Sequence, residues 1–135
     1  MLTLLTDFTI EIEYEDMRRA VDVLVYPSPE DLQDAIREYQ GYEDPDDNHT
    51  LGVCHRFETI HPDGTSDPLC AIVRLCEPHL GVGLISHEFA HAAVWLWELN
   101  HPDTPLETDN DEEFCWILGS LVKDCVNALH DRGVL

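Results

Sequence analysis

The segment GLISHEFAHAAVWLWEL, residues 83–99, is apolar along most of its length and carries two histidines four residues apart. We expect a helix from about Leu80 to Leu99, because Pro102 follows shortly after it and cannot continue a helix. Residues four apart lie about one turn apart, so His87 and His91 project from the same helix face. This helix with its polar face decides how the rest of the chain is interpreted.

Residues 87–91 form the pattern H-E-x-x-H, which predicts a zinc site. Two neutral imidazoles on one face can each give Zn²⁺ a nitrogen ligand. Glu88 lies beside the first ligand, where it can take a proton from a zinc-bound water and deliver it to a leaving amine. The alternative is a pair of core histidines with a coincidental glutamate. The apolar helix disfavours that alternative, because it gives a lone histidine pair no reason to be there.

A catalytic zinc site needs a third protein ligand, and the acidic start of the last predicted helix offers one. Glu112 and Glu113 follow His91 by 21 and 22 residues, enough to end one helix, turn and begin another. Either carboxylate would complete a His₂Glu site with a fourth position open for water. Glu98 lies on the same predicted helix as His91 but about 10 Å along its axis, which is too far for the two side chains to share a metal ion.

The remaining elements predict a single α+β domain over residues 1–135, with a small antiparallel or mixed sheet and helices on it. Two strands and a hairpin are expected from β-branched, apolar runs and turn residues: strands at about 8–12 and 21–26, and a hairpin of 51–60 with 69–76. Ser28 is expected to cap a helix from Pro29 to about Gln40, which Gly41 ends. The last helix is expected from about Asp111 to Leu129.

The chain carries 28 acidic and 7 basic residues, a formal net charge of −21. Such a field repels phosphate backbones and anionic lipid surfaces, so we expect neither nucleic acid nor a membrane as a partner. The N-terminus lacks the features of a signal peptide, and no stretch of roughly 18 apolar residues occurs. The five cysteines are odd in number and form no C-x-x-C pair, which predicts buried, reduced thiols in a cytoplasmic protein.

The pattern His87-Glu88-x-x-His91 followed by DEEFCWILG, residues 111–119, resembles the gluzincin family of zinc metallopeptidases. It is similar to small phage and bacterial proteins in which H-E-x-x-H precedes an N-E-A-F-A-Y-L-V-G-like helix start. The resemblance covers roughly the C-terminal half of the chain. It implies a zincin-like (minigluzincin) core, in which a short sheet accompanies an active-site helix and a second zinc-ligand helix. On this match Glu112 takes the place of the third zinc ligand, with Glu113 as the alternative.

The resemblance also implies that an edge strand, here at about residues 69–76, holds an extended peptide. Larger members of the family often carry an acidic residue four positions after the zinc glutamate, where it orients a histidine. This chain has Trp116 at that position. The partner that would orient a metal-binding histidine is therefore not identified from the sequence.

We therefore expect a zinc-dependent metallopeptidase or related amide hydrolase, with a peptide or protein as substrate. One alternative is a non-enzymatic module that keeps the fold and binds a partner, although Glu88 would then have no role as a base. A second alternative is a metal-dependent hydrolase of a non-peptide substrate. A group that stabilises the transition state is also required, and His101, Tyr42 and Arg74 are the candidates.

Overall fold

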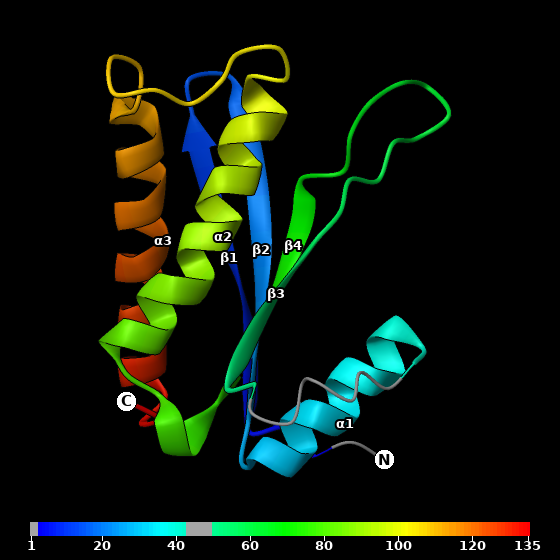
Figure 1. Ribbon diagram of the computed structural model, residues 1–135, viewed down its shortest axis with the longest axis vertical. Coiled ribbons are helices and arrows are strands. Elements are labelled where there is room, and N and C mark those ends of the chain that lie inside the picture. The colour runs from blue at the N-terminus through cyan, green and yellow to red at the C-terminus, as the bar shows by residue number, and fades with distance from the viewer. Residues whose placement is uncertain (1–2, 43–49) are drawn as a thin grey trace.

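The computed structural model of the chain describes residues 3–42 and 50–135, so most of the acidic run at 43–50, which the sequence predicts as a loop, lies outside the described residues. Within those ranges the chain forms an α+β domain with a four-stranded mixed sheet and three α-helices (Figure 1). The elements in chain order are β1 (Thr6–Tyr14), β2 (Met17–Tyr26), α1 (Pro29–Gln40), β3 (Gly52–Arg56), β4 (Leu69–Cys76), the short 3₁₀ helix η1 (Glu77–His79), α2 (Val82–Asn100) and α3 (Glu112–Asp131).

The strand order in the sheet is β1-β2-β4-β3. β1 and β2 pair antiparallel, β2 and β4 pair parallel, and β3 pairs antiparallel with β4. The predicted edge strand at residues 69–76 is therefore wrong, because β4 has a partner on each side. Strand β3 forms the edge of the sheet on that side, and β1 forms the other edge.

The two faces of the sheet pack against different helices. Side chains alternate along a strand, and the odd-numbered positions of β2 and β4 join α2 and α3 in the main core: Val21, Val23, Val25, Ala71, Val73, Leu75, Ile85, Phe89, Ile117 and Leu121. Tyr26 and Cys76 lie on the opposite face, where they pack with Leu32 and Ile36 of α1. In Figure 1, α2 and α3 run side by side in opposite directions, and α1 lies near the opposite end of the molecule from their connecting loop.

The helix boundaries follow the signals in the sequence. The Ser28 side chain accepts a hydrogen bond from the Asp31 backbone N–H at 3.2 Å, and Gly41 ends α1 in the left-handed region at φ 80°. α2 and α3 begin and end within two residues of the predicted bounds. The five cysteines are free, and Cys115 is exposed, which corrects the prediction that the thiols are buried. No helix among the described residues is long and apolar enough to cross a membrane.

Candidate metal centre

His87, Glu88 and His91 come together on the side of α2 that faces the edge of the sheet. Their potential ligand atoms all lie within 4.8 Å of one another. The two imidazole rings have centroids 5.1 Å apart and are nearly perpendicular, at 79°. Both histidines are exposed, whereas Glu88 is only 4% exposed. The site thus has two accessible nitrogen donors beside one sheltered carboxylate.

Strand β3 shelters Glu88. A Cβ atom on Gly52 would lie 3.0 Å from Glu88 Cγ, 3.0 Å from Leu84 Cδ1 and 3.2 Å from Glu88 Oε2. Glycine at this position therefore lets the strand backbone approach α2 closely enough to cover the carboxylate.

A cleft of about 330 Å³ opens between β3 and α2, beside this carboxylate. Glu88 and His91 line it from the helix, and Gly52, Cys54 and Arg56 line it from the strand. These three strand residues are two apart, so they share one face of β3. The cleft gives a substrate access to Glu88 and His91.

Burial raises the pKa of two groups in this cleft. It raises the pKa of Glu88 above its usual value, and the neighbouring His87 and His91 oppose the rise. Burial, followed by the Glu88 carboxylate, raises the pKa of the Cys54 thiol to about 12. Cys54 is therefore a neutral thiol near pH 7, and Glu88 is a stronger base than a solvated glutamate.

The structure does not bring the predicted third ligand to the histidine pair. Glu112 and Glu113 are the first residues of α3, and Glu113 contacts the Nε2 atom of His101, the C-cap residue of α2. His101 lies ten residues beyond His91, about 15 Å along the helix axis, which a glutamate side chain does not span. Among the described residues, the group that could hold a metal ion contains His87, Glu88 and His91 alone.

Two of the candidates for transition-state stabilisation lie away from the histidine pair. Arg74 lies on the face of the sheet that packs against α1, as its β-sheet partners Leu24 and Val53 show. His101 is engaged at the far end of α2. Tyr42 is 63% exposed and does not line the cleft. These predictions of Arg74 and His101 are therefore wrong for this cleft.

Arg56 is the cationic side chain that the structure places in the cleft, and the sequence argument missed it. The sequence does indicate that Arg56 and Gly52 share one face of β3, because side chains alternate along a strand and both positions are even-numbered. What the sequence could not supply was the knowledge that this face of the strand lies against α2.

Comparison of the chain with protein-family models, curated proteins and solved structures gives no match. The chemistry of the site is thus argued from its own residues. Two imidazoles with an adjacent carboxylate form a nitrogen and oxygen donor set of the kind that zinc prefers. Their mutual distances and the accessibility of both rings fit a bound ion, with other coordination positions left to water or to a further ligand.

Proposed function

We propose that this protein is a zinc-dependent amide hydrolase with a zincin-like core, acting as a metallopeptidase on a peptide or protein substrate. The observation that supports the proposal is the convergence of His87, Glu88 and His91 beside an open cleft. His87 and His91 hold the metal ion, and Glu88 is the general base. This set combines metal ligands with a buried proton acceptor, which a purely structural zinc site does not need.

The residues of the cleft have distinct roles in the reaction. Zinc at this position supplies Lewis acidity, which polarises a carbonyl group and makes water easier to deprotonate. Glu88 takes the proton from the attacking water and gives it to the leaving amine. Arg56 lines the same cleft, and we assign to it the stabilisation of negative charge that develops on the carbonyl oxygen.

The edge of the sheet offers a way to hold an extended substrate. β3 pairs with β4 on one side only, and its other side has no partner strand among the described residues. An extended peptide can therefore add to β3 by backbone hydrogen bonds, with its side chains alternating between the cleft and solvent. This role moves from residues 69–76, where the resemblance had put it, to Gly52–Arg56.

Metal content is the first test of the proposal. We expect about one zinc per chain in the purified protein, and loss of that zinc in His87→Ala and His91→Ala. His79→Ala is the matched control, because His79 is an exposed histidine outside the group. Absence of zinc from the wild-type protein, even after incubation with the metal, would reduce the H-E-x-x-H pattern to a coincidence.

The third ligand is tested in the same experiment. Glu112 keeps this role as a prediction from the resemblance, and it requires the start of α3 to reach the histidine pair. Zinc lost in Glu112→Ala and kept in Glu113→Ala would support that arrangement. Zinc kept in both variants would support the arrangement described above, in which His87 and His91 act without either glutamate.

A binding module that keeps the metal is the second candidate, and the distance of Glu112 from the histidine pair favours it. Glu88→Gln separates the two functions, because the amide cannot accept a proton. We expect this variant to retain zinc and lose at least a hundredfold in cleavage rate, measured by mass spectrometry of new termini in a mixture of denatured proteins. Zinc retention with no cleavage by either protein would support the binding module instead.

A further inference from the structure

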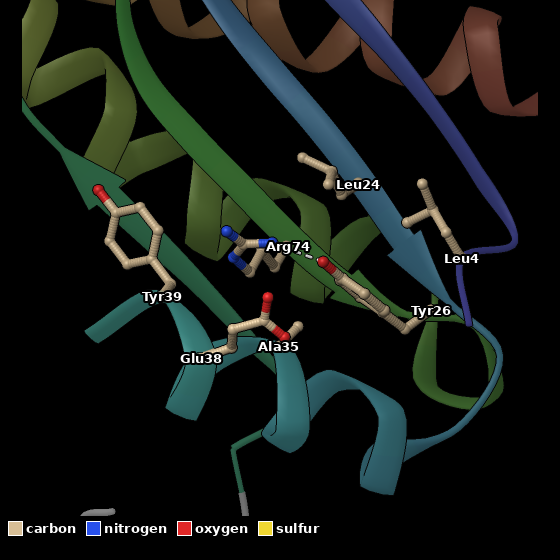
Figure 2. A pocket seen from close by; sticks show the side chains of 7 residues that line it. All are labelled: Leu4, Leu24, Tyr26, Ala35, Glu38, Tyr39 and Arg74. Atoms are coloured by element: carbon tan, nitrogen blue, oxygen red, sulfur yellow. Dashed lines mark hydrogen bonds between the residues drawn. The ribbon is translucent and has the colours of Figure 1, made fainter. Parts of the chain in front are cut away.

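A second cavity lies on the face of the sheet opposite α2 and is not used by the proposed hydrolase. It has a volume of about 380 Å³ and is bounded by β2, β4, α1 and the segment before β1 (Figure 2). Leu4, Leu24 and Ala35 form its apolar wall, and Tyr26, Tyr39 and Arg74 contribute polar or aromatic groups. A volume of this size suits a small organic molecule.

Arg74 is the unusual residue in this cavity. It is only 8% exposed, yet no carboxylate of the described residues forms an ion pair with it. Its Nε atom is buried and has no hydrogen-bond partner among the described residues. Buried arginines are ordinarily paired with an anion, because an uncompensated charge is costly to remove from water. Its side chain points into the cavity in Figure 2, so an anion held there would pair with its terminal nitrogens rather than with the enclosed Nε atom.

The groups around Arg74 prepare it for a planar anion. Arg74 Nη1 donates a hydrogen bond to the Tyr26 hydroxyl at 2.5 Å, and the Tyr39 ring lies 5.2 Å from the guanidinium carbon. These two contacts fix the guanidinium plane. The Tyr26 hydroxyl oxygen accepts from Arg74, so its own proton is available for a second acceptor. An arginine fork beside a hydroxyl donor matches the two oxygens of one carboxylate.

We propose that this cavity binds a small monocarboxylate with an apolar or aromatic body. The carboxylate pairs with the guanidinium of Arg74 and accepts from the Tyr26 hydroxyl, and the apolar body contacts Leu4 and Leu24. Because Glu38 also lines the cavity, a ligand with one negative charge meets less repulsion there than a dianion does. A phosphate dianion would lie near Glu38, whose carboxylate faces the cavity in Figure 2.

The probe pair that tests the charge requirement is phenylacetate and phenylacetamide, which have nearly the same shape and differ in charge. Each is titrated into the full chain labelled with ¹⁵N, and the Arg74 Nε–H signal and the backbone amides around Tyr26 are followed by NMR. We expect phenylacetate to shift these signals with a Kd on the order of 1 mM, as befits a ligand of this size, and phenylacetamide to bind at least tenfold more weakly. Equal binding of the two probes, or no shift with phenylacetate, would overturn the proposal.

Two variants connect the binding to the named residues. Arg74→Met is expected to abolish phenylacetate binding. Glu38→Gln alters only an exposed residue at the cavity, so the fold is not at risk, and it is expected to lower the Kd severalfold because it removes a like charge. Unchanged or weaker binding in Glu38→Gln would overturn the proposal even if Arg74→Met failed to fold. Tighter binding of inorganic phosphate than of phenylacetate would overturn the assignment to a monocarboxylate.

Discussion

At the scale of single residues, Gly52 shows how one missing side chain shapes the candidate metal centre. Its backbone approaches Glu88 so closely that any Cβ atom meets the glutamate side chain at 3.0 Å. We expect Gly52→Ala to cost about 1 to 2 kcal/mol of unfolding free energy, since either the strand or Glu88 must move. Urea unfolding followed by circular dichroism measures the cost.

Gly119 provides the matched control for this substitution. It lies on an exposed turn of α3, and a Cβ atom there would meet nothing within 4 Å. Gly119→Ala is therefore expected to raise the unfolding free energy by about 0.5 to 1 kcal/mol, because alanine favours the helix. Similar effects of the two substitutions would contradict the close packing of Gly52 on Glu88.

His55 gives a residue-scale prediction about pH. It stacks on Tyr39 with ring centroids 3.9 Å apart, and its Nε2 atom is buried without a hydrogen-bond partner among the described residues. Burial, followed by the positive charge of Arg74, lowers its pKa from 6.5 to about 4. Between these values the unfolded chain binds a proton that the folded protein excludes. The contribution of His55 to stability is thus complete above pH 6.5 and is lost as the pH falls toward 4.

His55→Phe keeps the ring stack and removes this proton. Between pH 7 and pH 4.5 we expect the variant to lose about 1 to 2 kcal/mol less unfolding free energy than the wild-type protein does. The difference is modest because the ring is only half-buried. Urea unfolding at both pH values measures the difference. His79→Phe, at an exposed histidine, should leave the pH dependence unchanged. If the unfolding free energy of His55→Phe changed with pH as much as that of the wild type, His55 would not be the source of the pH dependence.

At the scale of elements, α1 depends on its N-terminal cap. It buries only Leu32, Ala35 and Ile36, so its ends matter more than those of the longer helices. The Ser28 side chain accepts the hydrogen bond from the Asp31 N–H, and Ser28→Ala removes it. We expect a loss of about 1 kcal/mol and faster amide hydrogen exchange in the first turn of α1. Ser28→Thr keeps the hydroxyl and should retain most of the stability; an equal loss in both variants would exclude the cap as the cause.

The sequence predicts elements with local signals, such as the capped helix α1, better than it predicts the order of the strands in the sheet. Ser28 and Gly41 flank α1 and mark its start and stop in the sequence, whereas no side-chain cap hydrogen bond marks the start of α2 or α3. The sheet order depends on contacts between distant segments, for example the parallel pairing of Val23 with Val73. No local signal distinguishes an edge position from an interior one in the apolar run at 69–76. The edge strand was therefore placed wrongly, although both strands of the hairpin were predicted.

The candidate metal centre also has a part that follows from local sequence and a part that depends on the packing of distant segments. His87, Glu88 and His91 lie within little more than one helical turn, so their convergence follows from helix geometry alone. Glu112 depends on how the loop after α2 sets α3 against it, and the structure places the start of α3 beside His101. The resemblance supplied a role for Glu112, whereas the packing of the two helices decides whether that residue reaches His87 and His91.

At the scale of the whole molecule, the sheet separates two sites with different electrostatic demands. The cleft at α2 offers nitrogen and carboxylate donors that suit a cation, and the cavity at α1 holds an arginine that suits an anion. β4 contributes Arg74 to the second, and the neighbouring β3 contributes Gly52 and Arg56 to the first. The two sites therefore lie on opposite faces of one sheet and share the paired strands β3 and β4.

The net charge of −21 makes the stability of the whole chain depend on salt. Even if all 7 basic residues were paired, 21 of the 28 acidic residues would have no cationic partner. Repulsion among them favours the expanded, unfolded chain and weakens as ions screen it. We expect the midpoint of thermal unfolding to rise by about 5 °C between roughly 0.01 and 0.15 M NaCl, and more slowly above that, because the screening length has already fallen to about 8 Å. Scanning calorimetry with sucrose at matched osmolality is the control, since exclusion of a neutral solute stabilises without saturating in this range. A midpoint that is flat at low salt would mean that the acidic residues are too far apart in the folded chain to destabilise it.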